Sequence, residues 1–250
     1  MNKNKINLEI LYEDDNIVCI NKPEDVLTIP DRYDDKIFNL YEYLKEKYGN
    51  IYTVHRLDKG TSGAIIFAKD DLSHRNLNAQ FQENEVKKIY HFIVEGIIPK
   101  DEIDIDIPIS PSPFKKGESI PSARGKHSLT KLRVLKRYRN ATFCECDLVT
   151  GRHHQLRVHV AAIGFPLLVD ELYGNQEEFF VSTVKKKNYN LKKRTEERPI
   201  IKRITMHAHS LEFKHPITNE TVYIEAKYPK DFRAFLQVLD KYGKLKQFNN

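Results

Sequence analysis

One aspartate, on a turn between two apolar runs, is a candidate for a catalytic carboxylate. Asp58 lies in the segment RLDKGTSG, between the β-rich runs 51–55 and 64–68. Gly60 and Gly63 allow the backbone angles of a tight turn. Two buried strands would hold this carboxylate rigidly, so it is well placed to act as a nucleophile or a base. The same residue types also build tight turns without any function, and the segment alone leaves both interpretations open.

A cluster of cationic and histidine side chains lies further along, in the segment TGRHHQLRVHVAAIGFP. His153 and Arg157 are four residues apart and His154 and Arg157 are three apart, so on a helix they share one face. An arginine on that face can reach a buried carboxylate. Gly151 and Arg152 would expose N–H groups at the helix N-terminus, which suits a phosphate. A solvated cationic face without a ligand is the alternative.

The elements that must position these residues follow from hydrophobic periodicity. We expect strands at residues 8–12, 17–21, 51–55, 64–68, 88–95, 129–138, 142–149, 206–213 and 221–226. We expect helices at residues 38–48, 72–81 and 150–163 and from residue 231 onward. Thr150 is the expected cap of the third helix, and the proline- and serine-rich residues 99–126 predict a loop. Strands outnumber helices, so we predict an α+β fold with a mixed, largely antiparallel central β-sheet flanked by helices.

A length of 250 residues fits one large domain or two small ones and slightly favours one, and no domain boundary stands out, so we predict a single domain over residues 1–250. The composition is that of a rather polar globular protein, with 40% hydrophobic residues and a mean hydropathy of −0.58. No run of about 18 apolar residues occurs, so no transmembrane helix is expected. Charges interrupt the N-terminal apolar stretches, unlike in a signal peptide. Three cysteines are too few for a disulfide scaffold. We therefore expect a cytoplasmic protein.

One segment carries the whole basic surplus of the chain, whose net charge is +6. Residues 181–205, here called the basic arm, hold nine basic and two acidic residues, whereas the remaining 32 basic and 33 acidic residues nearly cancel. Basic segments commonly meet phosphate backbones, although a solvated loop without a partner has the same composition.

Metal ligands and nucleotide-binding loops are not indicated by the sequence. Cys144 and Cys146 alternate on one predicted strand, with Cα atoms roughly 7 Å apart, and are expected to be core residues. His207 and His209 alternate in the same way on another strand and are expected to be structural. No CxxC pair occurs, and the GxxxxGK[ST], GxGxxG and GxSxG motifs are absent from the chain. We therefore expect no metal and no cofactor.

Several motifs, taken in sequence order, resemble those of the RluA-type family of RNA pseudouridine synthases. HRLDKGTSGAIIFAK at residues 55–69 is similar to that family's catalytic motif, and NKP at residues 21–23 is similar to its opening. KKIYHFIVEG, which contains Lys88 and Tyr90, is followed in the family's order by GKHSLT, GRHHQLRVHVAAIGFPLL and MHAHSLEFKHP. The similarity spans roughly residues 8–229.

The resemblance implies a role for each candidate side chain. Asp58 would attack the target uridine, which frees the uracil to turn and rejoin through carbon 5. Arg157 would pair with Asp58 and keep it ionised. Tyr90 would stack on the flipped base and help to remove the proton from carbon 5, and Arg56 would push the nucleotide out and fill the gap. No cofactor or metal would be needed, because the carboxylate itself is the covalent catalyst. Further RNA contacts are expected at Arg152, His154, Lys185, Lys186 and Lys187.

The chain departs from the family pattern at a few positions. The chain reads Lys22-Pro23-Glu24-Asp25 where the family commonly reads KPxG. Val169 and Glu171 flank Asp170 where glycine and proline are frequent. These departures do not include the candidate catalytic residues, but they affect the local loops and the fit of the RNA.

Many relatives carry an N-terminal S4-type RNA-binding domain, whereas the strand pattern here begins at about Leu8, so no such domain is expected. We hypothesise that a basic insertion at about residues 175–205 compensates by binding phosphates.

The expected activity is isomerisation of specific uridines in structured RNA, either rRNA or tRNA, by a monomer without a membrane partner. Residues 99–126 and the basic arm are the expected selectors of the target. The alternatives are a non-catalytic RNA-binding protein on the same fold and a metal-dependent RNA hydrolase, against which the absent ligand spacing argues.

Overall fold

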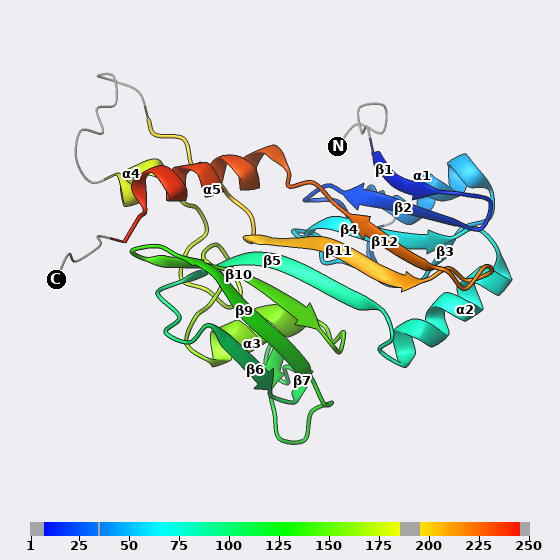
Figure 1. Ribbon diagram of the computed structural model, residues 1–250, viewed down its shortest axis with the longest axis horizontal. Coiled ribbons are helices and arrows are strands. Elements are labelled where there is room, and N and C mark those ends of the chain that lie inside the picture. The colour runs from blue at the N-terminus through cyan, green and yellow to red at the C-terminus, as the bar shows by residue number, and fades with distance from the viewer. Residues whose placement is uncertain (1–7, 35, 186–195, 246–250) are drawn as a thin grey trace. The chain divides into compact units, whose positions relative to one another are not determined.

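The computed structural model describes residues 8–34, 36–185 and 196–245, and Figure 1 labels their helices and strands. This part of the chain divides into two compact units. The first unit comprises the residues up to Tyr90 together with His207–Lys227, and the second comprises His91–Met206 and the residues from Tyr228 onward. The chain passes from the first unit to the second within strand β5 (Lys87–Glu95) and returns at the start of β11 (Met206–Lys214).

The first unit is built around a strand that is buried along its whole length, β4 (Ser62–Ala68). Its other elements are β1 (Glu9–Glu13), β2 (Ile17–Lys22), α1 (Leu40–Tyr48), β3 (Tyr52–Thr53), α2 (Asp71–Gln82) and β12 (Thr221–Glu225). The strand order is β1-β2-β4-β11-β12, and β3 pairs with β4. β11 runs parallel to β4, and the other pairs in this unit are antiparallel.

Simple sequence rules account for the helices and the core of this unit. The side chains of Asn39 and Asp70 cap α1 and α2 by accepting the N–H groups of Glu42 and Ser73. Strand side chains alternate between two faces, and alternate residues of β2 and β4 enter one core with Leu77 of α2. The buried members of this core on β2 and β4 are Ile17, Cys19, Ala64, Ile66 and Ala68.

The parallel pairing of β4 with β11 depends on a glycine. Gly63 has φ of +122°, and a Cβ atom at this position would lie 2.1 Å from the carbonyl oxygen of Ala208. Beside it, the ring of His207 bridges two elements, with Nδ1 2.9 Å from the Ser62 hydroxyl and Nε2 3.0 Å from the carbonyl oxygen of Ala226. Nε2 faces an acceptor and therefore carries the proton, so Nδ1 accepts from Ser62. His207 is the structural histidine that the sequence predicts.

In the part of the chain that the structure describes, the second unit contains a β-sheet, a small hairpin and three helices. Its elements after β5 are β6 (Glu102–Asp106), β7 (Ile109–Pro111), β8 (Ser119–Pro121), β9 (Leu129–Arg137), β10 (Ala141–Leu148), α3 (Gln155–Ala162), α4 (Val181–Val184) and α5 (Lys230–Tyr242). The sheet order is β5-β10-β9-β6, and β7 pairs with β8. The apolar face of α5 enters a core with Ile93 of β5, through Phe232, Phe235 and Leu239.

The prediction of a loop over residues 99–126 is wrong. The segment contains β6, which pairs antiparallel with β9, and the β7–β8 hairpin. The sequence EIDID of β6 has the period-two alternation of a strand, with Ile105 buried, but it is short and flanked by proline and serine. Pairing with β9, which is remote in sequence, stabilises this strand, and local propensity does not reveal such a partner.

The predicted start of the third helix is also wrong. α3 begins at Gln155, and its N-cap is His154, which has a left-handed φ of +55°. Thr150 instead accepts the N–H of Leu129 and donates to Oε1 of Gln155. The N–H of Arg152 donates to the same Oε1 atom at 3.0 Å, so the predicted phosphate site at a helix N-terminus there is wrong as well.

The predicted fold class is confirmed. The described strands form mixed but mainly antiparallel pairs with helices beside them. Cys144 and Cys146 are buried core residues of β10, as predicted. Among the helices that the structure describes, none has the length and apolar character required to cross a membrane.

The ring of His55 is held inside the first unit, three residues before Asp58. Its Nε2 accepts the N–H of Ile66 at 3.2 Å, and the ring stacks on Phe81 with 4.6 Å between centroids. Burial, together with the charge of Lys88, lowers the pKa of His55 to about 3. The imidazole is therefore neutral at neutral pH, as its acceptor role requires.

We predict that His55 makes the protein less stable at mildly acidic pH. The pKa of His55 is 6.5 in the absence of the fold and about 3 in the folded protein, so the unfolded chain binds the extra proton between these values. Stability is therefore lost as pH falls below about 6.5, by about 1 to 2 kcal/mol between pH 7.5 and 5.5. Urea unfolding at both pH values measures this loss, and His55→Gln should remove it. Equal pH dependence in the parent and the variant would contradict the assignment.

We also predict that Gly63→Ala is strongly destabilising. The added Cβ overlaps a backbone carbonyl and forces alanine into an unfavourable φ, which should lower the free energy of unfolding by about 3 kcal/mol or more. Gly151→Ala is the matched control, because an added Cβ there meets no atom within 4 Å. The control should change stability by less than about 1 kcal/mol. Chemical denaturation of both variants measures this difference. Similar losses of unfolding free energy in the two variants would show that a small backbone shift relieves the close contact.

Candidate catalytic residues in each unit

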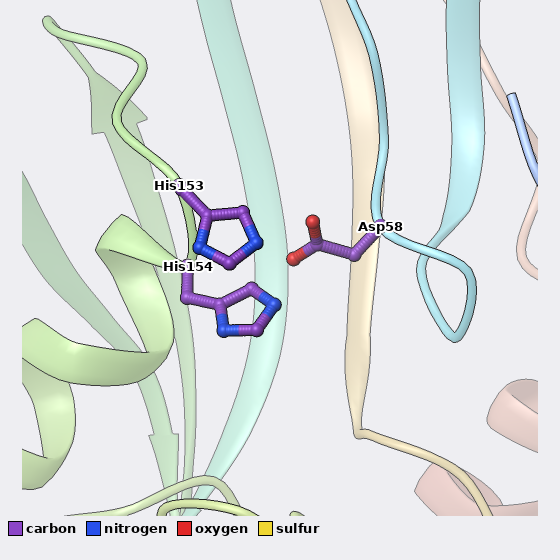
Figure 2. Close-up of side chains that lie close together, drawn as sticks. All are labelled: Asp58, His153 and His154. Carbon is purple, nitrogen blue, oxygen red and sulfur yellow. The ribbon is translucent and has the colours of Figure 1, made fainter. Parts of the chain in front are cut away.

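Asp58 lies on the loop between β3 and β4 of the first unit, and Figure 2 shows its carboxylate. The residue is half-buried, and its carbonyl oxygen accepts the N–H of Thr61 at 3.0 Å. This hydrogen bond closes a turn over Lys59 and Gly60. Because the fully buried β4 follows at once, the loop ends on a rigid strand. The structure has the turn between two strands that the sequence predicts, while the role of Asp58 stays a prediction.

Arg56 and Tyr90, the other candidates of the first unit, differ in exposure. Arg56 is exposed, which leaves its guanidinium accessible to a ligand. Tyr90 lies on β5 and is only 9% exposed. Two residues earlier on the same strand, Lys88 is also buried, and its Nζ donates to the carbonyl oxygen of Val86 at 3.1 Å. The low exposure of Tyr90 restricts the orientations of its ring, and the stacking of this ring on a base stays a prediction.

Arg157, on α3 of the second unit, forms a buried ion pair with Asp170. Its Nε donates to Oδ2 at 2.8 Å and its Nη2 donates to Oδ1 at 2.6 Å, so two parallel hydrogen bonds fix the plane of the guanidinium. The Arg157 and Asp170 side chains are 8% and 0% exposed. The N–H groups of Leu172 and Tyr173 also donate to Oδ1. The prediction that an arginine of this helix reaches a buried carboxylate is confirmed. The alternative prediction, a solvated cationic face, is wrong for Arg157.

His154 extends this network from the N-terminus of α3. Nη1 of Arg157 lies 3.1 Å from its Nε2, and the Tyr173 hydroxyl lies 2.9 Å from its Nδ1. Because the guanidinium is only a donor, Nε2 accepts and the proton of the neutral ring resides on Nδ1. His153 stacks on His154 with 3.8 Å between centroids, as Figure 2 shows, and its Nδ1 lies 3.0 Å from the Ser119 hydroxyl. The second unit therefore presents a cation and two imidazoles in fixed orientations.

These contacts define what each unit can do chemically. The first unit holds a carboxylate on a short loop, which suits covalent attack on an electrophilic carbon. The second unit holds a guanidinium whose position is set by a buried carboxylate, which suits stabilisation of a negative charge. The predicted pairing of Arg157 with Asp58 stays a prediction, because the two residues belong to different units.

The candidate RNA-contact residues of the second unit have different surroundings. Arg152 is exposed, and its Nε donates to the carbonyl oxygen of His127 at 3.1 Å. Lys185 follows α4, and its Nζ lies 5.3 Å from the centre of the Tyr242 ring. Lys186 and Lys187 lie outside the described residues.

One basic residue of the arm, Arg203, has a structural partner within the second unit. Its guanidinium donates to both carboxylate oxygens of Asp231, at 2.7 and 3.0 Å, and the residue is 7% exposed. Ile201, two residues earlier, is 2% exposed and belongs to the core of the second unit. The C-terminal end of the arm is therefore part of the folded unit.

Three residues of the Arg157 network, Asp170, Tyr173 and Ser119, were not among the sequence candidates. Asp170 directly follows the buried residues Leu167–Val169. An acidic residue after a buried run needs a cationic or donor-rich partner, and this is the signal that the sequence offered. Tyr173 and Ser119 carry no comparable signal, because their contact depends on how the hairpin packs.

A comparison with family models gives one match over most of the first two thirds of the chain. The model described as RNA pseudouridylate synthase matches residues 16–162. This range includes Asp58, Tyr90 and Arg157.

Curated proteins and solved structures agree with this match. The chain is 35% identical over 221 residues to the dual-specificity RNA pseudouridine synthase RluA of Pasteurella multocida, covering 88% of this chain and 92% of that protein. It is 35% identical over 238 residues to the ribosomal large subunit pseudouridine synthase D of Neisseria meningitidis, of which it spans 61%. The structure of human RNA pseudouridylate synthase domain containing 4 superposes with a TM-score of 0.72 at 25% identity, covering 93% of each chain. Because the family model covers more than half of the chain and relatives above 30% identity extend along most of it, this chain belongs to the RNA pseudouridylate synthase family.

Proposed function

We propose that this enzyme uses Asp58 as the nucleophile that converts specific uridines of a structured RNA to pseudouridine. The observation that supports the proposal is the position of Asp58, half-buried on a tight turn within the region that matches the family. The loop exposes Arg56 two residues away. A nucleophile on a turn fixed by a buried strand, beside an accessible cation, suits attack on a nucleotide that has been drawn out of its helix.

The proposed reaction is an isomerisation, so every atom of the uridine is retained. The Asp58 carboxylate attacks the nucleotide, the bond between the sugar and N1 of the base breaks, and the uracil turns within the site. Carbon 5 then bonds to the sugar as the aspartate leaves, and carbon 5 gives up its proton while N1 gains one. Tyr90 stacks on the base and assists the removal of that proton. The carboxylate supplies the covalent step, so the proposal needs no metal and no cofactor.

Arg157 and Arg56 have different proposed roles. Arg157 pairs with Asp58 and places its positive charge beside the carboxylate. The contacts of Arg157 with Asp170 and His154 support this role, because they hold the guanidinium in one orientation. Arg56 inserts where the flipped nucleotide was stacked, which its exposure permits.

The proposed substrate is rRNA or tRNA. The names of the relatives support an RNA substrate for this chain, since one is a dual-specificity RNA enzyme and the other acts on the ribosomal large subunit. We further propose that the two units act together as one catalytic domain, that the enzyme works as a monomer in the cytoplasm, and that Arg152, His154 and the lysines at 185–187 contact the RNA. Residues 99–126, which include the β7–β8 hairpin, and the basic arm are the proposed selectors of the target uridine.

Asp58→Asn tests the proposed nucleophile. The amide is nearly isosteric with the carboxylate but cannot attack, so isomerisation should fall by about 1,000-fold or more while RNA binding stays within about threefold. Release of tritium from carbon 5 of labelled uridine in RNA measures the reaction, and a filter-binding assay measures affinity. Exposed Asp71→Asn is a control of the same chemistry on α2 and should remain fully active. If Asp58→Asn were fully active, Asp58 would not be the nucleophile. If the parent protein converted no uridine in total cellular RNA, a non-catalytic RNA-binding protein would be favoured.

Substitution of Lys185, Lys186 and Lys187 by glutamine tests the basic arm. If these lysines neutralise phosphates, the slope of log affinity against log salt should become shallower by about 0.7 to 0.9 for each phosphate that is no longer neutralised. The variant Lys45→Gln, Lys47→Gln, Lys87→Gln removes the same charge from exposed positions of the first unit. An unchanged slope in the arm variant, or an equal change in both variants, would refute a specific role for the arm. Deletion through Arg203 is a poorer test, because it also removes the ion pair with Asp231.

A further inference from the structure

Both neighbours of Asp58 in the chain are held by side chains from one other segment of the first unit. The side chain of Thr28 forms hydrogen bonds with the backbone of Leu57, and the side chain of Lys22 forms one with the backbone of Lys59. Together with the turn hydrogen bond from Thr61 to Asp58, these contacts fix the backbone on each side of the carboxylate.

Thr28 makes two hydrogen bonds to the same residue. Its hydroxyl donates to the carbonyl oxygen of Leu57 at 3.0 Å and accepts the N–H of Leu57 at 3.2 Å. Thr28 is 3% exposed and Leu57 is 5% exposed, so water does not replace these bonds easily. One hydroxyl thus satisfies the buried N–H and the buried carbonyl of the residue that immediately precedes Asp58.

Lys22 holds the other side of the loop. Its ammonium is completely buried and donates to the carbonyl oxygens of Pro23, Val26 and Lys59, at 2.9, 2.6 and 3.1 Å. An ammonium has three N–H donors and no acceptor, so carbonyl oxygens are suitable partners for it in a buried position. A buried charge is tolerated only with such partners, so the position of the Lys59 carbonyl is strongly constrained.

Thr28 and Lys22 are themselves anchored in regular structure. The carbonyl oxygen of Thr28 accepts the N–H of Tyr41 in α1 at 3.0 Å. Lys22 is the last residue of β2 and pairs with Gly63 of β4. The loop of Asp58 is therefore tied to a helix through Thr28 and to a strand through Lys22.

We propose that Thr28 and Lys22 are positioning residues that set the direction of the Asp58 carboxylate for attack. The proposal rests on the proposed function, in which Asp58 is the nucleophile. Neither side chain needs to touch the RNA, because each acts on the backbone beside Asp58. A nucleophile must be held within a fraction of an ångström of its attack geometry, so loosening the loop reduces the rate of the chemical step and leaves the binding of the RNA unchanged.

Thr28→Val is the first test, since valine keeps the shape of threonine and removes only the hydroxyl. We expect kcat to fall by about 10- to 100-fold with KM for the RNA unchanged. Thr28→Ser keeps the hydroxyl and should restore kcat to within about threefold of the parent. If Thr28→Val does not fold, Thr28→Ala replaces it, because a smaller side chain removes the same hydroxyl without a branched methyl group.

The second unit offers a matched control at Thr142. Its hydroxyl, on β10, donates to the carbonyl oxygen of Gly96 at 2.8 Å and accepts the N–H of Ile98 at 3.1 Å. Both partners lie in the loop between β5 and β6, which holds no catalytic candidate. Thr142 is completely buried. Thr142→Val therefore removes an equivalent pair of hydrogen bonds, and we expect it to lower the melting temperature as Thr28→Val does while kcat remains within about threefold of the parent.

The outcomes separate this proposal from the proposed function. A loss of kcat in Thr28→Val, absent from Thr28→Ser and Thr142→Val, supports the positioning role. A normal kcat in Thr28→Val with an inactive Asp58→Asn overturns the positioning role and retains Asp58 as nucleophile. Equal losses of kcat in Thr28→Val and Thr142→Val also overturn it, since activity would then follow stability. An active Asp58→Asn refutes the proposed function itself.

Discussion

The close approach of β4 and β11 is the constraint on which the first unit depends. A parallel strand pair at this position leaves no room for a Cβ atom at residue 63, and Gly63 provides that room. The same strand carries the Asp58 loop at its N-terminal end, and its alternate side chains build the core beneath α2. Because β4 is buried on both faces, it cannot shift without disturbing both neighbours. The strand that follows the Asp58 loop is therefore held by packing, and the hydrogen bonds of Thr28, Lys22 and the turn extend that order to the backbone beside Asp58.

The second unit depends on a different kind of interaction, the buried pair of Arg157 and Asp170. Removing either partner would leave a buried charge without its ion-pair partner, which typically costs about 3 to 5 kcal/mol. Such a pair contributes little net stability, but it fixes the direction of a guanidinium that would otherwise have many rotamers. The contact of Arg157 with His154 and the packing of Tyr173 against the guanidinium extend the same order to the neighbouring rings. Electrostatic rigidity here serves the purpose that strand packing serves in the first unit.

The sequence was most informative where local pattern and tertiary environment agree. The continuous apolar runs IVCI at residues 17–20 and AIIFA at residues 64–68 predicted β2 and β4 closely, because strands buried on both faces need apolar residues throughout. The last helix followed from Phe232, Phe235 and Leu239, which share one face. Prediction failed where distant partners decide the structure. β6 exists because β9 pairs with it, and α3 begins after Thr150 because Gln155 Oε1 takes the hydrogen bonds that a cap would otherwise make.

The candidate residues show the same division. Sequence motifs alone determined that Asp58 stands on a turn between strands, that Arg157 lies on a helix, and that the chain belongs with enzymes that modify RNA. Motifs record residue types in order, and these roles depend on residue type. The tertiary structure decided which groups support them: Asp170 for Arg157, and Thr28 and Lys22 for the Asp58 loop. Such partners lie 13 to 37 residues away along the chain, and only the folded backbone brings a hydroxyl or an ammonium within hydrogen-bonding distance of them.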